Sequence, residues 1–284
     1  MLQNNQNIGL IVDDICSLPN EIIEKYQIEI VRTKLFFPEL EKNPERNLYQ
    51  IMAETKSCPK TSAPSPGNYL KVYKKVLEKF EKVLVISLSS KLSGCYNSAL
   101  EAKQFLPDPS RIIIFDSLQA VAPEGLLVIK AAKMIEQKQD IEEIVKNLEN
   151  IKEEARLFAF LETTYWVEKI GRMTHLQGNI FKILKVIGVQ PMIGIRKGRV
   201  DLTGFNFWTK DTLQAIFNQL KHLKGKYKKI EIGMNYTNNI DLAYKLKEKL
   251  KKDLETDVVF TSLNPPIVGA NTGPGTLLVG CLSI

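Results

Sequence analysis

The sequence predicts an α/β protein of two domains: residues 1–156 form a mostly parallel α/β/α sandwich, and residues 157–284 form an α/β domain with a mixed sheet. Two observations lead to this prediction. The first half repeats a unit of apolar run, polar loop and helical pattern four times, which is typical of parallel strands covered by helices. The second half has a Lys197-Gly198 turn between two strand-like runs, which indicates an antiparallel hairpin.

Apolar runs and helical spacing define the elements of the first half, with prolines and glycines at their boundaries. We expect strands over 8–12, 28–37, 83–86 and 111–115, and helices that open at 18–21 and cover 47–56, 65–80, 125–137 and 141–156. The stretch 59–70 holds three prolines, so we expect most of it to be a stiff, irregular loop. Polar residues at the strand ends should converge, because parallel strands end at one edge of their sheet. They are Asp13, Ser87 and Asp116-Ser117.

The second half mixes shorter strands with helices. We expect strands over 157–161, 189–195, 229–235 and 258–263, a hairpin partner that runs to Phe207, and helices over 163–170, 210–223 and 239–250. Three glycines and a proline in 269–275 predict a tight loop whose backbone can approach a ligand closely. The last run, 276–284, fits a strand or a short buried helix, and its periodicity does not separate the two.

Composition and length are those of a globular protein. The 284 residues can bury a sizeable core, 44% of them are apolar, and every apolar run is shorter than the roughly 18 residues of a membrane span. No basic residue precedes the apolar run at 8–12, so we expect no export signal. Cys16, Cys58, Cys95 and Cys281 lack CxxC spacing, which argues against a zinc site or a disulfide framework and favours a reducing, cytoplasmic location.

The net charge of +7 does not predict a nucleic-acid partner. Many lysines fall in 71–82, 221–229 and 245–252, where they are typical of the solvated faces of amphipathic helices. Common enzyme motifs are absent from the sequence, which has no GxSxG elbow, no GxGxxG after a strand and no GxxxxGK[ST] loop. We expect His222 on the surface, and His175 there as well, with a place near the site as the alternative for His175, and we predict no metal site and no catalytic residue.

Three loops are candidate ligand-binding segments. The loop 87–94 lies between a predicted strand and a predicted helix, where N–H groups and hydroxyls can hold an anion. The competing interpretation is that Ser93 only caps the helix. The proline-rich loop 59–70 and the glycine-rich loop 269–275 are the other two segments. The polar side chains that these loops offer are Thr61, Ser62, Ser93, Asn271 and Thr272.

Five sequence blocks, taken together and in order, resemble those of the DegV family of bacterial fatty acid-binding proteins. They are PKTSAPSPGNY, ISLSSKLSGCYNSA, FDSLQAVAPEGLLV, VEKIGRMTHLQGNIFKILKVIGVQPMIGIRKGRV and VGANTGPGTLLVG, and they extend over nearly the whole chain. The resemblance implies two α/β domains that bury an acyl chain and expose its carboxyl end to a separate, ATP-using fatty acid kinase subunit. It also implies lipid binding without catalysis, no cofactor on this chain, and a place in phospholipid metabolism.

The resemblance further implies which residues bind the fatty acid. By motif position, the carboxylate contacts fall on Thr61 and Ser93, and the arginine of the family's GGR block falls on Arg172, with Ile170 in the first glycine position. The chain departs from the family at Asn271, where histidine is common, and in VDDICSLP, where a TDSTSDLP-like block is common. Asn271 can donate a hydrogen bond but cannot carry a proton. The complete set of predicted ligand-binding residues is Thr61, Ser62, Ser93, Gly94, Arg172, Asn271 and Thr272.

These observations give one hypothesis of function and two alternatives. We expect the protein to bind a long-chain fatty acid, to hold its carboxylate with Thr61 and Ser93, and to present it to a fatty acid kinase subunit, with at most transient contact with a membrane surface. The first alternative is an enzyme that acts on a small phosphorylated or acyl substrate in the same cleft. The second is a lipid carrier that serves no kinase.

Overall fold

The computed structural model describes residues 8–207, 209 and 211–284. Two sequence-based expectations fall partly outside these residues. They are the start of the chain before the first strand, where we expect no export signal, and Lys210, the first residue of an expected helix.

Strands and helices alternate along the first half of the chain. Its elements, with η for a 3-10 helix, are β1 (Ile8–Asp13), η1 (Asp14–Cys16), α1 (Asn20–Lys25), β2 (Glu29–Val31), β3 (Lys34–Phe36), α2 (Pro38–Glu41), α3 (Leu48–Thr55), β4 (Lys60–Ser62), α4 (Pro66–Leu77), β5 (Lys82–Ser87), α5 (Cys95–Lys103), η2 (Pro109–Arg111), β6 (Ile112–Asp116), α6 (Val121–Glu136), α7 (Ile141–Ile151) and η3 (Lys152–Glu154).

The second half is richer in strands. Its elements are β7 (Ala155–Phe160), α8 (Tyr165–Lys169), α9 (His175–Val186), β8 (Gln190–Arg196), β9 (Arg199–Asn206), α10 (Thr212–Lys226), β10 (Ile230–Tyr236), α11 (Ile240–Leu254), β11 (Val258–Leu263), α12 (Pro266–Thr272) and β12 (Leu277–Ser283). The final run of the sequence is therefore a strand, which periodicity alone did not decide.

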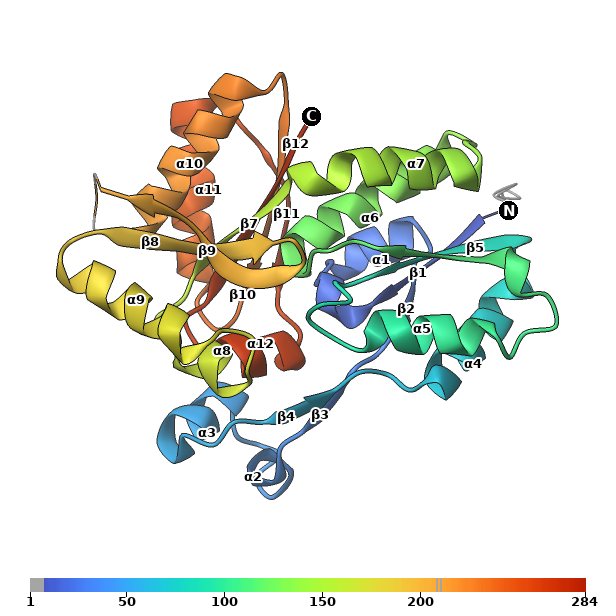
Figure 1. The fold of residues 1–284 in the computed structure, drawn as a ribbon, viewed down its shortest axis with the longest axis horizontal. Coiled ribbons are helices and arrows are strands. Elements are labelled where there is room, and N and C mark those ends of the chain that lie inside the picture. The colour runs from blue at the N-terminus through green and yellow to red at the C-terminus, as the bar shows by residue number, and fades with distance from the viewer. Residues whose placement is uncertain (1–7, 208, 210) are drawn as a thin grey trace.

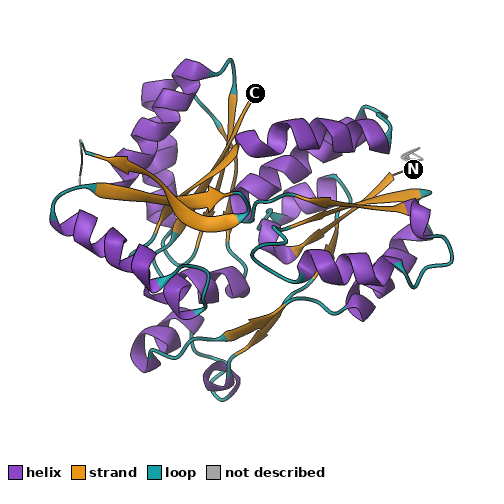
Figure 2. Cartoon of the chain, in the orientation of Figure 1, coloured by secondary structure: helices purple, strands orange, loops and turns teal. Residues whose placement is uncertain are grey.

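The strands form three sheets (Figures 1 and 2). Four parallel strands run in the order β2-β1-β5-β6, and six strands form a mixed sheet in the order β11-β10-β12-β7-β8-β9. In the mixed sheet β10 and β11 are parallel and the other neighbours are antiparallel. The predicted α/β class is confirmed, and so is the hairpin at Lys197-Gly198, which joins β8 to β9. The division into domains 1–156 and 157–284 stays a prediction.

Alternating apolar side chains explain why helices cover both faces of the four-stranded sheet. Ile11, Val83 and Val85 pack in one cluster with residues of α4 and α5, whereas Leu84 and Ile86 pack on the opposite face with residues of α6. Such burial on both faces is typical of parallel sheets.

Helix α6 lies between the two large sheets, as Figure 1 shows. It contacts β1 of the parallel sheet and also β7, β10 and β12 of the mixed sheet. Residues on every side of α6 are buried, including Glu124 and Gly125, because both faces of the helix meet a sheet. One face of the mixed sheet is covered by α10 and α11, which leaves part of the other face for the cavity described below.

The single strand predicted over 28–37 is wrong. The structure has β2, which pairs with β1, and β3, which pairs with β4 in a separate two-stranded sheet. Between them, the backbone N–H and the hydroxyl of Thr33 both donate to the Asp14 carboxylate, at 3.0 and 2.7 Å. These bonds turn the chain away from the parallel sheet, so that β3, β4, α2 and α3 form a small lobe below the two large sheets in Figure 1.

Four other predicted boundaries need correction. The proline-rich loop contains a short strand, β4, at the three residues that follow Pro59. The helix predicted over 141–156 ends at Ile151, and β7 already begins at Ala155. Helix α6 begins at Val121, four residues before the predicted start. The loop predicted over 269–275 is helical in its first half, because α12 extends to Thr272 and ends where Gly273 takes a φ of 87°.

Candidate functional site

Carboxylates at the ends of two parallel strands hold the hydroxyl-bearing loop 87–94. Asp13, the last residue of β1, is buried and accepts a hydrogen bond from the backbone N–H of Leu88 at 2.9 Å. Asp116, the last residue of β6, accepts one from the N–H of Ser90 at 3.2 Å. The loop is therefore tied to the two neighbouring strand ends, as the parallel topology predicts.

The buried acids behind this loop favour their protonated forms. Burial raises the pKa of Asp13 to about 7, although the hydrogen bond from Leu88 opposes the shift. Burial and the nearby Asp13 charge raise the pKa of Glu124 well above its ordinary value. Neither oxygen of Glu124 has a hydrogen-bond partner in the described part of the chain. Both acids are buried, and neither is among the residues that line the cavity described below.

One cavity of about 220 Å³ brings all seven predicted ligand-binding residues to its wall. A single water needs only about 10–15 Å³ in the same measure, so the cavity has room for a ligand of many atoms. The residues that line it are Ile15, Thr33, Thr61, Ser62, Ala63, Leu88, Leu92, Ser93, Gly94, Ala120, Val121, Leu157, Ala159, Leu161, Val167, Ile170, Arg172, Ile193, Gly194, Ile195, Val200, Ile267, Val268, Asn271, Thr272 and Leu278. Their roles in binding stay a prediction.

Polar and apolar parts of the wall come from different elements. The strands β7, β8, β9 and β12 of the mixed sheet contribute only apolar side chains and one glycine. The polar side chains come from β4, from the loops after β2, β5 and α8, and from α12. Among the described residues that line the cavity none is aromatic, so the apolar part consists of flexible aliphatic groups. Such a wall suits an alkyl chain better than a flat ring.

The two hydroxyls predicted to hold a carboxylate differ in their surroundings. Thr61 lies on β4, is half-buried, and its hydroxyl makes no hydrogen bond to another described residue. Ser93 accepts a long hydrogen bond from the N–H of Cys95 at 3.4 Å, and its oxygen lies 3.2 Å from the Cys95 sulfur. The N-cap of α5 is Gly94, so Ser93 is not the capping residue of the helix.

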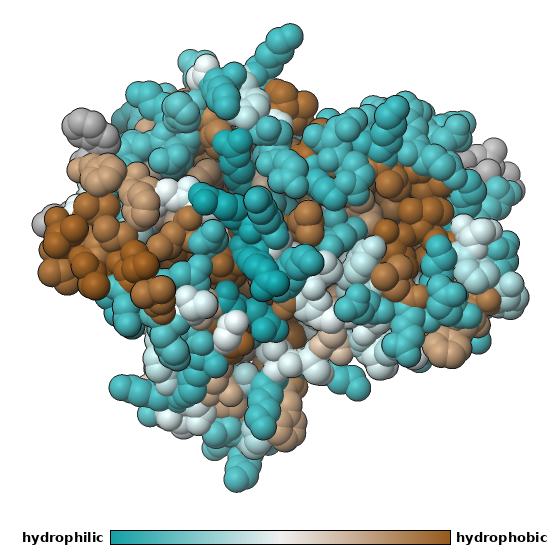
Figure 3. Space-filling model, viewed as in Figure 1, coloured by the Kyte–Doolittle hydropathy of each residue, from teal (hydrophilic) through white to brown (hydrophobic). Residues whose placement is uncertain are grey.

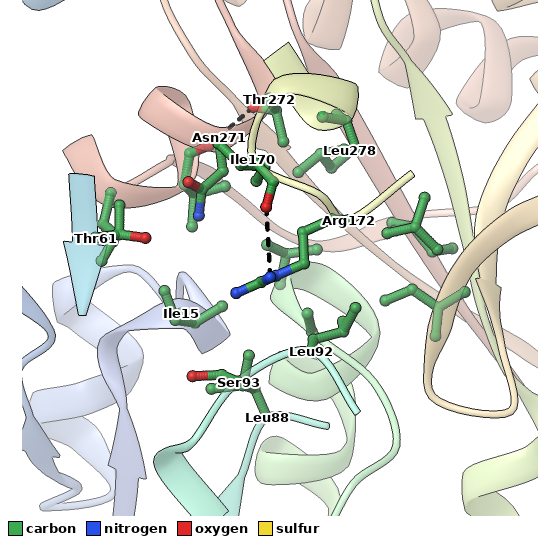
Figure 4. A pocket seen from close by; sticks show the side chains of 18 of the residues that line it. Ile15, Thr61, Leu88, Leu92, Ser93, Ile170, Arg172, Asn271, Thr272 and Leu278 are labelled. Carbon is green, nitrogen blue, oxygen red and sulfur yellow. Dashed lines mark hydrogen bonds between the residues drawn. The ribbon is translucent and has the colours of Figure 1, made fainter. Parts of the chain in front are cut away.

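Arg172 provides the one charged side chain among the described residues of the cavity wall. It lies in the loop between α8 and α9 and is exposed, and its Nη1 approaches the carbonyl oxygen of Ile170 at 3.5 Å. Figure 4 shows its guanidinium projecting into the space that Thr61, Asn271 and Ser93 surround. The polar end of the cavity therefore combines neutral donors with one positive charge, which favours an anionic head group.

The two predicted residues of α12 are not equivalent. The Thr272 hydroxyl donates to the carbonyl oxygen of Val268 at 3.0 Å, so its proton is engaged within the helix. The Oδ1 atom of Asn271 is buried and has no hydrogen-bond partner in the part of the chain that the structure describes. Asn271 is thus the α12 side chain with free polar capacity at the cavity.

Sequence reasoning missed Thr33 and nearly all of the apolar wall. Thr33 follows β2 at the same sheet edge as the other polar residues, so its position at a strand end was the available signal. Alternate side chains of β7 and β8 line the cavity, because alternate residues of a strand face the same side of the sheet. They are Leu157 and Ala159 on β7, and Ile193 and Ile195 on β8. Alternation alone does not say which face meets a ligand.

Some side chains considered in the sequence lie apart from the cavity. His175 is exposed, with its Nδ1 at 3.3 Å from a carboxylate oxygen of Glu168. Within residues 8–207, 209 and 211–284 no cluster of three or more His, Cys, Asp or Glu side chains is arranged to hold a metal ion. Among the helices formed by these residues, none combines the length and apolar character that a membrane crossing requires.

Comparisons with known sequences give consistent matches over the whole chain. Residues 7–283 match the family described as "Uncharacterised protein, DegV family". A "Fatty acid-binding protein" of Thermotoga maritima is 28% identical over 288 residues, with 96% of each chain covered. A DegV domain-containing protein of Caldanaerobacter subterraneus is 24% identical over 274 residues, with 95% of this chain and 96% of the relative covered.

Solved structures share the fold. A DegV family protein from Thermus thermophilus, described by its fatty acid binding, superposes with a TM-score of 0.81 at 23% identity, covering 98% of this chain and 100% of that one. A stearic acid-binding protein from Eubacterium ventriosum gives a TM-score of 0.83 at 22% identity, covering 97% and 98%. Since the family match extends over almost every residue and the fold agrees, the chain belongs to the DegV family.

Proposed function

We propose that this protein binds a long-chain fatty acid, with its carboxylate at Thr61 and Ser93 and its tail against the mixed sheet. The observation that carries the proposal is the separation of the cavity wall into a polar end and an aliphatic remainder. Relatives add support, because the similar protein of Thermotoga maritima is named a fatty acid-binding protein and that of Eubacterium ventriosum a stearic acid-binding protein.

Burial of the tail supplies the affinity. At about 0.8 kcal/mol per methylene, the tail of a C16 acid gains about 11 kcal/mol before the cost of ordering it. The carboxylate can therefore be held by few contacts. The hydroxyls of Thr61 and Ser93 donate to it, while Arg172 adds a favourable charge.

In this proposal the carboxylate is presented to a separate, ATP-using fatty acid kinase subunit. Hydroxyl donors leave a carboxylate oxygen free, whereas a bidentate arginine would engage both oxygens. The free oxygen attacks the γ-phosphate of ATP on the partner, and the product is an acyl phosphate, a precursor for phospholipid metabolism. The proposal places this exchange in the cytoplasm, where the partner finds ATP.

Transient contact with a membrane surface forms part of the same proposal, because an apolar patch lies over α9 (Figure 3). Leu176, Ile183 and Val186 of this helix are 70%, 61% and 85% exposed. Helix α9 begins three residues after Arg172, so the patch lies on the element that follows the loop of Arg172. Apolar helix faces of this kind bind at the boundary between head groups and acyl chains. Ile183→Glu should reduce sedimentation with anionic vesicles and leave affinity for free fatty acid unchanged.

The decisive experiment measures fatty acid binding and phosphorylation of the bound acid separately. Mass spectrometry of the purified protein under native conditions should find a bound fatty acid, and added palmitate should bind if none is carried. Thr61→Ala and Ser93→Ala should each weaken binding about five- to tenfold, the effect of one lost hydrogen bond of about 1 kcal/mol or slightly more. Thr55→Ala, which changes a hydroxyl outside the cavity, is the matched control.

The outcomes separate the candidate functions. If no fatty acid is carried and none binds, the proposal fails. If a fatty acid binds but no kinase subunit phosphorylates the complex, the protein is a carrier without a kinase. Full phosphorylation by both alanine variants would contradict the roles of Thr61 and Ser93.

A further inference from the structure

The mixed sheet is open between β7 and β8. These two strands pair at a single position, Ala159 with Ile193, whereas β8 and β9 pair over seven positions. From that pair toward Ala155 and Arg196, the facing backbone groups of β7 and β8 have no ladder between them. The two backbones still meet at Gly194, where an added Cβ would collide with the carbonyl oxygen of Leu157, so the split lies beyond this contact, on the side where the β8–β9 hairpin turns.

The side chain of Gln119 fills part of this split. It comes from the loop after β6, is 6% exposed, and its Nε2 donates to the carbonyl oxygen of Ala155 at 2.8 Å. That bond replaces one bond that a strand partner would have made. The Oε1 atom of Gln119 is buried and without a hydrogen-bond partner among the described residues, so an unused acceptor lies in the split.

A second cavity, of about 380 Å³, occupies the split. It shares Leu157 and Ile195 with the first cavity, so the two cavities adjoin at these side chains. Unlike the first cavity, its wall has many polar side chains, which stand beside apolar ones such as Phe158, Met192 and Leu223. Its ionisable side chains are Glu153, Arg156, Arg196, Lys197 and His222.

The balance of charge in the second cavity is positive. Arg156 is paired with Glu154 at 3.0 Å and is also bonded to the Tyr227 hydroxyl, so its charge is compensated. Arg196 and Lys197 are exposed and form no ion pair with any described residue. Glu153 supplies one opposing carboxylate. Two uncompensated cations therefore face a space that the far end of the aliphatic cavity adjoins.

From this arrangement we infer that the protein accepts fatty acids that carry a second oxygen function at the far end of the chain, a carboxylate or a hydroxyl. The inference rests on the proposed function: the first carboxylate lies at Thr61 and Ser93, and the chain follows the aliphatic wall. Its far end passes Leu157 and Ile195 into the second cavity. There a carboxylate meets Arg196 and Lys197, and a hydroxyl donates to the Oε1 atom of Gln119.

The polar wall of the second cavity discriminates between ligands. The methyl end of an ordinary fatty acid would contact apolar side chains such as Phe158 beyond Leu157 and Ile195, but it would also cover polar groups that lose water without gaining a partner. An oxygenated end gives these groups a partner. Chain length then matters, since the second oxygen function must reach the split while the carboxylate stays at Thr61.

Calorimetry with three ligand series tests the inference: saturated monocarboxylic acids, α,ω-dicarboxylic acids and ω-hydroxy acids of matched lengths. At one length or a narrow range of lengths, the diacid or the hydroxy acid should bind at least tenfold more tightly than the monoacid. Arg196→Met should abolish the gain for the diacid and leave the monoacid unchanged. Gln119→Met should do the same for the hydroxy acid. Lys71→Met, which removes one exposed charge from α4, is the control.

A diacid or hydroxy acid that gains affinity at one length and loses the gain in its matching variant supports the inference. The inference is overturned if both series bind more weakly than the monoacids at every length. It is also overturned if the gain survives in both variants. Binding of the monoacids distinguishes failure of this inference from failure of the proposed function, because the proposed function fails only if the monoacids do not bind either.

Discussion

Replacement of Glu124 by glutamine should flatten the dependence of folding stability on pH. Glu124 is fully buried on α6, and burial together with the Asp13 charge raises the pKa of its carboxyl well above 4.5. The folded protein therefore keeps this proton at pH values where the unfolded chain has released it. A group with a raised pKa stabilises the folded state below its unfolded pKa, and this contribution is lost as pH rises toward the folded pKa.

The magnitude follows from proton linkage. Each retained proton reduces the free energy of unfolding by about 1.4 kcal/mol per pH unit. Between the unfolded pKa of Glu124, about 4.3, and its raised folded pKa, the wild type should therefore lose stability relative to Glu124→Gln as pH rises, by up to about 1.4 kcal/mol per pH unit, whatever constant offset the amide introduces. The difference between the two proteins removes the contributions of titrating groups that do not interact with Glu124, whereas the Asp13 charge enters the difference because it raises the pKa of Glu124.

Urea unfolding followed by far-UV circular dichroism at pH 5.5, 6.5 and 7.5 measures this difference. The two stability profiles should diverge steadily as pH rises. Parallel profiles would refute the reasoning, because they would mean that Glu124 has the same proton affinity in the folded and unfolded states.

Three further predictions concern the frame of the cavity. Gly273→Ala should lower the free energy of unfolding by roughly 2–4 kcal/mol, because its φ is 87° and the added methyl would meet Trp166. Gly225→Ala should raise it by roughly 0.5–1 kcal/mol, because Gly225 lies in α10 with open space around it. Equal effects of the two substitutions on the melting temperature would contradict this prediction. Ser65→Ala should lower the free energy of unfolding by about 1 kcal/mol, because it removes the capping box of α4. An unchanged midpoint of urea unfolding would contradict this prediction. Ala159→Leu narrows the cavity at its aliphatic wall and leaves less room for a long tail. In calorimetry it should weaken binding of a C18 acid roughly tenfold more than binding of a C14 acid.

Local signals account for the parts of the fold that the sequence predicts well. Ser65 followed by Pro66 predicts the start of α4, and the structure shows the reciprocal bonds between Ser65 and Asn68. Polar residues directly after apolar strands predict the edge where the ligand-binding loops meet, since parallel topology alone brings those ends together. Both inferences need only neighbouring residues and the general rules of the fold.

Long-range contacts explain where prediction fails. The break between β2 and β3 depends on Thr33 reaching Asp14, nineteen positions away in the chain. The helical first half of the 269–275 segment places Gly269 against the ring of Tyr49, a contact that leaves no space for a side chain there. Glycine weakens an isolated helix, so α12 depends on tertiary packing, which includes this contact and the burial of Ile267 and Val268. Neither contact can be recognised from a short window of sequence, because the two partners lie far apart in the chain.

The two interpretations of Ser93 illustrate how far a site can be inferred. Its position between strand and helix fits a cap as well as a ligand contact, and the sequence offers no means to choose. The structure assigns the N-cap of α5 to Gly94, although the Ser93 hydroxyl also accepts a long hydrogen bond of 3.4 Å from the N–H of Cys95, the first residue of that helix. Ser93 also lies in one cavity wall with Thr61 and Arg172, a placement that capping does not require, and a head group that accepts hydrogen bonds is the partner that we propose for these residues.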